Sequence, residues 1–209
     1  MKRQAVLSIF AVTVFLIGAW SFESVHTTSQ AATDAAPSKA YFAGGCFWCM
    51  EEAFEKVDGV SSVISGYMGG TVANPSYEAV SAGRTGHAEA VEVVYDQAKV
   101  SYEKLLDAFW RNVDPITPNA QFCDHGSQYR SAVFFQTDEE KRASDTSKQV
   151  IEQSKRFTEP IVTQIVMASQ FYPAEEYHQD FYKKNPVRYK FYKYNCGRAR
   201  RLEELWGNP

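Results

Sequence analysis

Residues that build metal sites and disulfide scaffolds are scarce in this sequence. Cysteine occurs four times and histidine four times in 209 residues. A zinc site usually needs a second C-x-x-C pair or a paired histidine motif, whereas Cys46 and Cys49 form a single C-x-x-C and the histidines are scattered. Four cysteines in a chain of this length are also too few for a disulfide scaffold. We therefore predict no metal site. The single C-x-x-C is instead interpreted through the reactivity of its cysteines.

A strong excess of charge is also lacking. The chain has 22 lysine and arginine residues against 25 aspartate and glutamate residues, which gives a formal net charge of −3. A mildly acidic chain lacks the excess of basic residues with which proteins bind the phosphates of nucleic acid. We therefore predict no nucleic-acid partner. Basic and aromatic residues alternate near the C-terminus, but a segment that wraps back over a small α/β domain would use its tyrosines in the same way.

Long apolar runs are missing except at the N-terminus. Lys2 and Arg3 precede an uncharged, largely apolar run over residues 5–20, and small polar residues follow it. This pattern is typical of a secretory signal peptide, and the run is shorter than the roughly 20 residues that a membrane-spanning helix needs. We predict an exported protein, periplasmic or otherwise extracytoplasmic, with residues 1–32 as a cleaved signal. An uncleaved membrane anchor formed by residues 5–20 is the alternative.

The rest of the chain is predicted to form one domain. Residues 33–39 contain Pro37 and small polar residues, so they are interpreted as a linker. Residues 40–209 are enough for one full-sized core, because 44% of the chain is hydrophobic. Apolar runs predict strands over 60–67, 86–95, 131–136 and 161–168, and helical spacing predicts helices over 101–112 and 138–157. Two β-α-β passages indicate an α/β two-layer sandwich.

The stretch around Cys46 organises the chain. Residues 40–43 are strand-like, the glycine pair Gly44-Gly45 follows, and residues after Cys46 have helical spacing up to Gly59. Cys46 is therefore expected where a helix begins, and the unpaired amides at that end favour a thiolate. We predict a lowered pKa for Cys46 and a reactive nucleophile. The alternative is a small buried hydrophobic residue.

Two further features offer partners for a nucleophile. Glu89 shares one face of the strand over 86–95 with Val91 and Val93, and an apolar setting would raise its pKa toward that of a neutral-pH proton donor. The alternative places Glu89 at a solvated strand end beside His87. Residues 121–130 are dense in hydrogen-bonding side chains, which suits a site, although ordinary solvated loops have a similar composition.

These residues leave three hypotheses open. The first is a thiol enzyme that attacks an electrophilic sulfur or carbonyl with a proton donor such as Glu89. The second is a thioredoxin-like dithiol oxidoreductase whose whole site is Cys46 and Cys49. The third is a binding module in which the C-x-x-C is a structural staple. Phe47 and Trp48 would form an apolar wall beside the nucleophile, which suits a small apolar group on a substrate.

Several separate motifs carry a resemblance to a known family. They are Gly45-Cys46-Phe47-Trp48, Gly66-Tyr67-x-Gly-Gly, Asn74-Pro75-x-Tyr77, Thr85-Gly86-His87-x-Glu89, Asp124-x-Gly126-x-Gln128-Tyr129-Arg130-Ser131 and Glu176-x-His178-Gln179. With these motifs in this order, the chain resembles peptide methionine sulfoxide reductases of the A class from about Tyr41 to Gly207. The resemblance implies that residues 40–209 are a catalytic domain with a ferredoxin-like sandwich, a mixed sheet and a long irregular C-terminal segment.

The resemblance also implies an activity and a site. Cys46 would attack the sulfur of an S-epimer methionine sulfoxide, free or in a protein, and Glu89 would protonate its oxygen. The substrate-binding residues would be an apolar pair around the methyl group and polar residues around the oxygen: Phe47, Trp48, Tyr77, Asp124 and Tyr129. Methionine would leave and Cys46 would remain as a sulfenic acid. No cofactor is required, and we expect a monomer.

The cysteine that resolves the sulfenic acid is not fixed by the sequence. Cys49 follows Cys46 by one helical turn, at a position where many family members have glycine, and Cys196 matches the family's C-terminal resolving cysteine. Our working hypothesis is a relay from Cys46 through one to the other, opened by a thioredoxin-like reductant. Cys123 is interpreted as a buried bystander, with a part in the relay as the alternative.

Overall fold

The computed structural model describes residues 37–207. The predicted signal peptide or anchor, and the linker up to residue 36, lie outside the described residues. Within residues 37–207, no helix combines the length and apolar character needed to cross a membrane. The first strand begins at Ser38, two residues before the predicted domain start, so Ser38 and Lys39 belong to the sheet and not to a linker.

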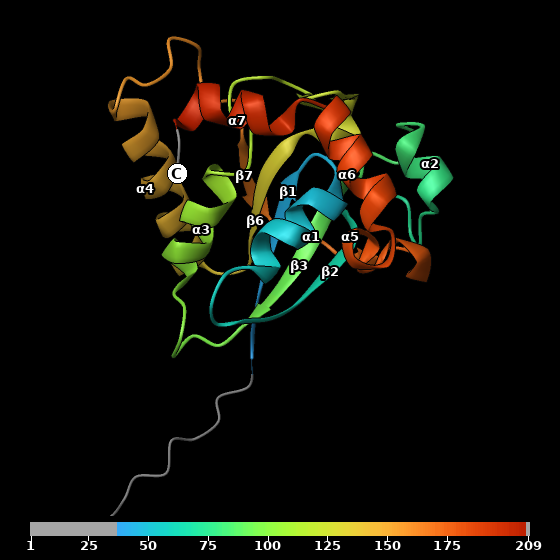
Figure 1. Ribbon diagram of the computed structural model, residues 1–209. Helices are drawn as coiled ribbons and strands as arrows, with labels where there is room; N and C mark the ends of the chain where they lie inside the picture. Colours follow the sequence, from blue (N-terminus) through green and yellow to red (C-terminus); the bar gives the residue numbers. More distant parts are fainter. Residues whose placement is uncertain (1–36, 208–209) are drawn as a thin grey trace, which may run out of the picture. The chain divides into compact units, whose positions relative to one another are not determined.

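A six-stranded sheet forms the centre of the fold (Figure 1). Its strands, in the order β7-β6-β1-β3-β2-β8, are antiparallel except for the parallel pair β6 and β7. Their bounds are β1 Ser38–Gly44, β2 Val60–Met68, β3 Ala88–Tyr95, β6 Ser131–Phe135, β7 Gln164–Met167 and β8 Tyr172–Pro173. The inner order β6-β1-β3-β2 is the ferredoxin-like arrangement, so the predicted α/β sandwich with a mixed sheet is confirmed.

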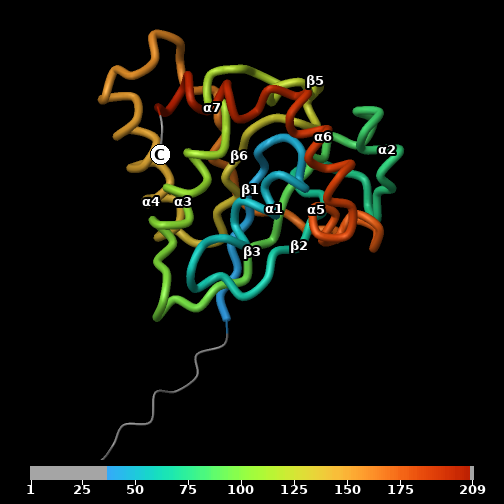
Figure 2. The backbone as a smooth tube through the Cα atoms, in the orientation of Figure 1, coloured from blue at the N-terminus to red at the C-terminus, as the bar shows by residue number. Residues whose placement is uncertain are grey.

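Three helices pack with the sheet strands and bury the main core. α1 (Phe47–Glu55) packs on β2 and β3, α3 (Tyr102–Trp110) contacts α1 and β1, and α4 (Asp138–Gln153) packs on β6 and α3. Figure 2 shows α1 and α3 crossing the same face of the sheet. Phe42 of β1 stacks on Phe54 of α1 and Phe109 of α3, with ring centroids 4.8 and 5.4 Å apart. These contacts fix where α1 begins relative to β1.

Helix starts follow local capping rules. The hydroxyl of Ser101 accepts a hydrogen bond from the Lys104 amide at the start of α3, and Thr137 does the same at the start of α4. A short helix that we did not predict, α2 (Tyr77–Ser81), begins after Ser76, which caps it in the same way. This helix matters for the site because it positions Tyr77.

The C-terminal segment is more regular than predicted. Instead of a long irregular stretch, the structure has β8, a 3₁₀ turn η2 (Glu176–His178), α5 (Phe181–Lys184), α6 (Pro186–Asn195) and α7 (Arg198–Trp206). Aromatic side chains occupy several sides of α6, with Tyr189 buried and Tyr194 85% exposed. Because no single apolar stripe results, helical periodicity could not be recognised there.

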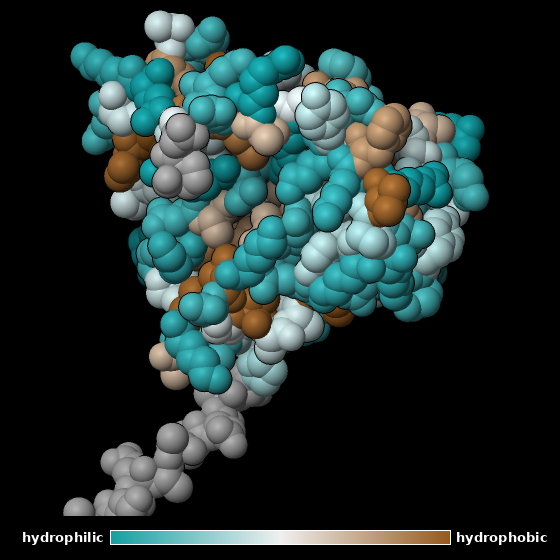
Figure 3. Space-filling view, viewed as in Figure 1, coloured by the Kyte–Doolittle hydropathy of each residue, from teal (hydrophilic) through white to brown (hydrophobic). Residues whose placement is uncertain are grey.

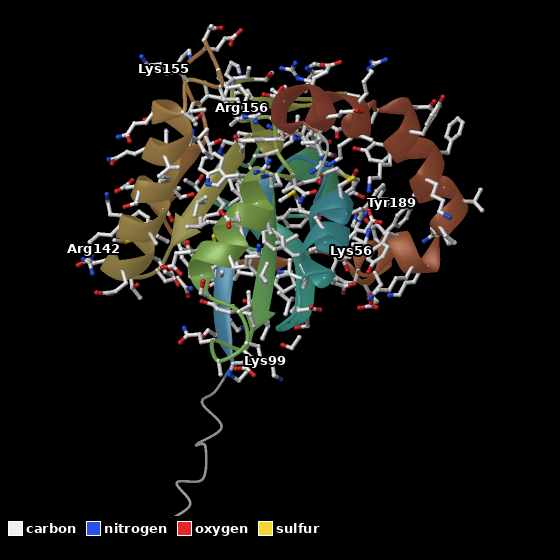
Figure 4. All side chains as sticks on the ribbon, turned by 60° about the vertical axis from the view of Figure 1, so that its left-hand side comes forward. Lys56, Lys99, Arg142, Lys155, Arg156 and Tyr189 are labelled. Atoms are coloured by element: carbon white, nitrogen blue, oxygen red, sulfur yellow. A yellow bond between two sulfur atoms is a disulfide. The ribbon has the colours of Figure 1, made fainter. Side chains whose placement is uncertain are left out.

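The segment folds back over α1, as the aromatic content indicated. Tyr189, labelled in Figure 4, lies on α6 and donates a hydrogen bond to Glu52 of α1 at 2.6 Å. The face shown in Figure 3 is largely hydrophilic, with apolar side chains in small groups.

A small hairpin, β4 (Ala120–Gln121) and β5 (Asp124–His125), precedes the 3₁₀ turn η1 (Ser127–Tyr129). The predicted polar stretch 121–130 is therefore this hairpin and turn.

Candidate active site

Cys46 stands at the junction of β1 and α1. It is the N-cap residue of α1 and only 6% exposed. Gly45 before it has φ +79°, and a Cβ at that position would lie 2.4 Å from Cβ of Gln121. Only glycine tolerates both this backbone conformation and this close approach. The glycine therefore lets the chain turn sharply from the strand and present the cysteine at the helix start.

Glu89 is buried against the same helix start. It lies near the beginning of β3, is 3% exposed, and its Oε2 accepts a hydrogen bond of 3.0 Å from the backbone amide of Phe47. Burial raises the pKa of Glu89 to about 8, although the Phe47 amide opposes the shift. The alternative of a solvated strand end is wrong. A carboxyl group with this pKa holds a proton at neutral pH and can donate it.

The predicted lowering of the Cys46 pKa is wrong. Burial raises the pKa of this thiol well above its ordinary value, and the neighbouring Cys49 and Glu89 raise it further, while the Tyr192 hydroxyl opposes the shift. The helix dipole argument failed because burial disfavours the thiolate more strongly than the helix start favours it. The first free amide of α1, on Phe47, is also donated to Glu89, whose ionised form it stabilises, and Cys46 rests as a thiol.

Cys49 carries the negative charge of the cysteine pair. A hydrogen bond from the Cys46 thiol lowers the pKa of Cys49 to about 6 despite burial, and the charges of Arg198 and Lys193 and the hydroxyl of Tyr189 act in the same direction. Two adjacent thiols cannot both ionise easily, so the thiolate that forms first holds its neighbour protonated. Both cysteines are free, and Cys49 is 3% exposed.

A small cavity brings the predicted site residues together. Its volume is about 60 Å³. Eight residues from five segments of the chain line it: Cys46, Phe47, Trp48, Tyr77, Glu89, Asp124, Tyr129 and Tyr192. All seven residues predicted to attack, protonate or bind the substrate are among them. A cavity of about 640 Å³ between α3 and α4 is larger, but its lining includes no cysteine.

Tyr192 is the lining residue that sequence reasoning missed. Its hydroxyl donates a hydrogen bond to Oδ2 of Asp124 and also interacts with Cys46. The sequence held one signal, since Tyr192 precedes Cys196 by four residues, which is one helical turn. That signal was hidden because α6 was not recognised as a helix.

The other two cysteines form a disulfide. Cys123 and Cys196 are bonded across a sequence separation of 73 residues. The interpretation of Cys123 as a bystander is therefore wrong, because the β4–β5 hairpin carries it to the C-cap of α6, where Cys196 lies. Cys123 is exposed and Cys196 is half-buried. The structure thus contains a buried dithiol and a disulfide that reaches the surface.

Clusters with metal-ligand chemistry are few among residues 37–207. One joins Cys123, Asp124 and Cys196, but its sulfurs are used in the disulfide. The other comprises Glu51, Glu55 and Asp180, and the ammonium group of Lys183 forms ion pairs with two of them, at 2.6 Å from Glu55 and 2.9 Å from Asp180. The absence of a metal requirement stays a prediction.

The raised pKa of Glu89 predicts a stability that falls as pH rises. The unfolded carboxyl loses its proton near pH 4.5 and the native one near pH 8, so in this window the native state binds an extra proton. The stabilisation is fully present below pH 4.5 and is lost as pH rises toward 8. We expect the unfolding free energy of the wild type to fall by about 1.4 kcal/mol per pH unit more than that of Glu89→Gln.

Urea unfolding of both proteins between about pH 5 and pH 8 measures this difference. Glu78→Gln, on the exposed side of α2, is the matched control and should run parallel to the wild type. If Glu89→Gln also ran parallel to the wild type, the carboxyl group would not be protonated in the folded state.

Comparison with known proteins gives the family. The model of the family described as peptide methionine sulfoxide reductase matches residues 38–209. The chain is 48% identical over 169 residues to peptide methionine sulfoxide reductase MsrA of Halalkalibacterium halodurans, covering 81% of this chain and 96% of that protein. The corresponding protein of Bacillus subtilis is 48% identical over 168 residues, covering 80% and 95%.

Solved structures agree with the sequence comparison. The reduced form of Mxr1 from Saccharomyces cerevisiae superposes with a TM-score of 0.67 at 33% identity, covering 72% of this chain and 87% of that one. Methionine sulfoxide reductase A of Corynebacterium diphtheriae gives a TM-score of 0.66 at 31% identity, covering 74% and 78%. The match over the whole described domain confirms the predicted resemblance, and the chain belongs to the peptide methionine sulfoxide reductase family.

Proposed function

We propose that the protein reduces the S-epimer of methionine sulfoxide, free or in proteins, to methionine and thereby repairs oxidised proteins. The observation that carries this proposal is the placement of a cysteine thiol and a protonated carboxyl group on one small cavity. Family membership supplies the substrate, and the geometry supplies a mechanism that uses the residues of this chain.

The reaction needs a nucleophile at sulfur and a proton at oxygen. The sulfur of Cys46 attacks the sulfoxide sulfur, and its own proton passes to the Cys49 thiolate with which it interacts. Glu89 gives its proton to the sulfoxide oxygen. The oxygen is transferred to Cys46, methionine leaves, and Cys46 is left as a sulfenic acid while Glu89 regains its proton from solvent.

Polar and apolar walls divide the cavity around the two ends of the sulfoxide. Phe47 and Trp48 provide the apolar wall for the methyl group. Burial raises the pKa of Tyr77 to about 12 and that of Tyr129 further, so both hydroxyls remain hydrogen-bond donors. We assign these hydroxyls to the sulfoxide oxygen, where they meet developing charge without reorganisation. Asp124, held by Tyr192, orders this polar side.

Removal of the nucleophile and of the acid should affect the reaction differently. We expect Cys46→Ser to abolish reduction of S-sulfoxide, because a serine hydroxyl is not nucleophilic enough to attack sulfur.

Glu89→Gln should lower kcat by about 10²- to 10⁴-fold, because the amide cannot donate a proton to the leaving oxygen. The wild-type rate should fall as pH rises through about 8, as Glu89 loses its proton. Methionine production from resolved sulfoxide epimers measures all three effects.

The same assay distinguishes the alternative of a thioredoxin-like oxidoreductase. Insulin disulfide reduction by the wild type, without reduction of the sulfoxide, would favour that alternative. Retained sulfoxide reduction by Cys46→Ser would overturn the proposed mechanism.

We further propose that Cys49 resolves the sulfenic acid. Cys49 interacts directly with Cys46, whereas Cys196 is bonded to Cys123 in this structure. Condensation of the Cys49 thiol with the sulfenic acid forms a Cys46–Cys49 disulfide and releases water. A thioredoxin-like reductant cannot reach this disulfide easily, because both sulfurs belong to residues that are at most 6% exposed.

The surface pair offers the route to the reductant. Attack by the reduced Cys196 thiolate on the buried disulfide, followed by attack of Cys123 on the mixed disulfide, restores the inner dithiol and leaves Cys123–Cys196 oxidised. Two thiol–disulfide exchanges change no overall oxidation state. In the structure Cys46 and Cys49 are free and Cys123 is bonded to Cys196. This pairing is the product expected of the two exchange reactions. The relay hypothesis is kept, with Cys123 as its last member.

A relay of two dithiols predicts a stoichiometry. Fully reduced enzyme without reductant should form about two molecules of methionine per chain, since each dithiol supplies two electrons. The double variant Cys123→Ser/Cys196→Ser should form about one, at an unchanged rate for that first turnover. Rapid quench with methionine analysis measures both, and mass spectrometry locates the disulfides.

The single variant Cys49→Ser tests the resolving step. If it forms a Cys46 disulfide and recycles as fast as the wild type, Cys49 is not the resolver. About one methionine per wild-type chain would contradict transfer to the outer pair.

We also propose export of a monomeric enzyme. The support for export is Lys2 and Arg3 followed by the apolar run 5–20, which lie outside the described residues, and the monomer stays an expectation. After cleavage, sequencing of the N-terminus of the purified protein should begin near Thr33. An intact Met1 in the membrane fraction would favour the anchored alternative, and intact protein in the cytosol would contradict export.

Because an extracytoplasmic enzyme is separated from cytosolic thioredoxin, its reductant would be a thioredoxin-like protein of its own compartment.

A further inference from the structure

Arg198 is a buried cation without a carboxylate partner. It is the first residue of α7 and is only 3% exposed. Among the described residues 37–207, no ion pair includes it. Arg201, one turn further along the same helix, is paired with Asp114 at 2.9 Å. An arginine keeps its charge in proteins, and a buried charge is strongly destabilising unless another charge balances it.

Neutral groups hold the guanidinium group of Arg198 in place. It donates hydrogen bonds to the carbonyl oxygens of Asn112 and, at 3.5 Å, of Gly44, and its Nη2 lies 3.3 Å from Sδ of Met50. The ring of Phe122 covers one face, with its centroid 4.4 Å from the guanidinium carbon. Carbonyl oxygens and an aromatic face carry only partial charges. These contacts therefore fix the position of the guanidinium group but leave its full charge unbalanced.

The same contacts place this charge beside the C-x-x-C. Gly44 precedes Cys46 by two residues, and Met50 directly follows Cys49. The guanidinium group thus touches the segments that flank the cysteine pair on both sides, at the end of β1 and in the first turns of α1. The charge of Arg198 favours the ionised form of Cys49.

Few other charges compete with Arg198 at Cys49. The titratable and charged groups that act on this thiol come from α1, β3, α6 and α7: Cys46, Glu89, Tyr189, Lys193 and Arg198. The carboxyl group in this set holds its proton at neutral pH, and the tyrosine and the other thiol are neutral donors. Lys193 is ion-paired with Glu52 of α1. In the described part of the chain, Arg198 is therefore the uncompensated cation beside the dithiol.

Asp124 is the rival counter-charge. Burial raises the pKa of its carboxyl group, while the hydrogen bond from Tyr192 and the charge of Arg198 oppose the shift. Asp124 thus remains harder to ionise than an ordinary aspartate, whereas the pKa of Cys49 falls to about 6, below that of an ordinary thiol. The pair of opposite charges is consequently better formed with Cys49.

We propose that Arg198 is the counter-charge of the Cys49 thiolate and thereby makes Cys49 the base for Cys46. This consequence rests on the proposed function, in which Cys49 takes the Cys46 proton and later condenses with the sulfenic acid, the proton leaving with the hydroxyl group as water. Arg198 favours the loss of that proton as well. It acts through Cys49 and is a positioning residue, and the pairing of charges does not depend on the reaction.

A thiolate titration tests the pairing without any sulfoxide. With the outer disulfide closed, Cys46 and Cys49 are the free thiols. The ultraviolet absorbance of the thiolate should rise with a midpoint near pH 6, and Cys49→Ser should lose this step. Arg198→Gln keeps a hydrogen-bond donor but no charge, so its midpoint should lie about one pH unit or more higher.

Matched variants separate the charge from the packing of the side chain. Arg198→Lys keeps the charge and should hold the midpoint closer to that of the wild type than Arg198→Gln does. Arg200→Gln removes an exposed arginine from the same helix and should leave the midpoint unchanged. If Arg198→Gln lacks a cooperative thermal transition, Arg198→Met takes its place as the neutral variant.

Two results of the titration would overturn the assignment. One is a wild type without a thiolate step below about pH 8, the range of an ordinary thiol. The other is a midpoint in the neutral variant equal to that of the wild type, which would leave Asp124 as the counter-charge. Equal midpoints in Arg198→Lys and the neutral variant, both shifted, would show that packing and not charge is responsible.

A single-turnover pH profile tests the consequence for the reaction. Methionine formation by reduced Arg198→Gln should be about 5-fold slower than that of the wild type at pH 6, for a midpoint shift of one pH unit. The two rates should converge above about pH 8, where Cys49 is ionised in both proteins. Both proteins retain Glu89, so the ratio of rates cancels its titration.

The outcomes keep the two proposals apart. A deficit that is the same at every pH would contradict the role of Arg198 as a counter-charge. Wild-type protein that reduces no sulfoxide would contradict the proposed function, and the thiolate titration would still decide the role of Arg198.

Discussion

The hydrogen bond between the Phe47 amide and Glu89 is the interaction on which the site depends. It joins the start of α1 to β3, and it uses the first unpaired amide of the helix, which would otherwise stabilise a thiolate at Cys46. Burial keeps the carboxyl group protonated, and the amide limits that shift. The bond therefore holds Glu89 beside Cys46, while burial leaves a proton on Glu89 and leaves the nucleophile as a resting thiol that needs a neighbouring base.

The division between a buried and a surface cysteine pair follows from this arrangement. Cys46 must lie beside Glu89, so it is enclosed with Cys49 beneath the aromatic residues of α5 and α6. Burial protects the reaction from water but also keeps a protein reductant away. The disulfide between Cys123 and Cys196 lies at the end of α6, where one of its sulfurs belongs to an exposed residue. The C-terminal helices thus cover the pocket and, in the proposed relay, also carry the electrons from it to the surface.

Much of the site was predictable because its residues lie in short motifs with recognisable chemistry. The glycine turn before Cys46, the aromatic pair after it and the strand that carries Glu89 all have local signals. The place of Tyr192 in the pocket and the Cys123–Cys196 bond depend on how a hairpin and a helix far apart in the sequence meet, and the spacing of Tyr192 from Cys196 is a signal only once α6 is known to be a helix. The pKa of Cys46 was predicted with the wrong sign, since local reasoning could not know how deeply the thiol is buried or that Glu89 takes the Phe47 amide.

The sequence by itself determined the α/β class, the position of Cys46 at a helix start and the family resemblance, because strand alternation, helix spacing and motifs are local properties of the chain. The sheet order, the helical form of the C-terminal segment and the pairing of the four cysteines were decided only by the tertiary structure. Each of these depends on contacts between distant residues, and burial of those contacts sets the protonation of Glu89, Cys46 and Cys49. The chemistry of this site is therefore encoded in local motifs, but its protonation states are set by packing.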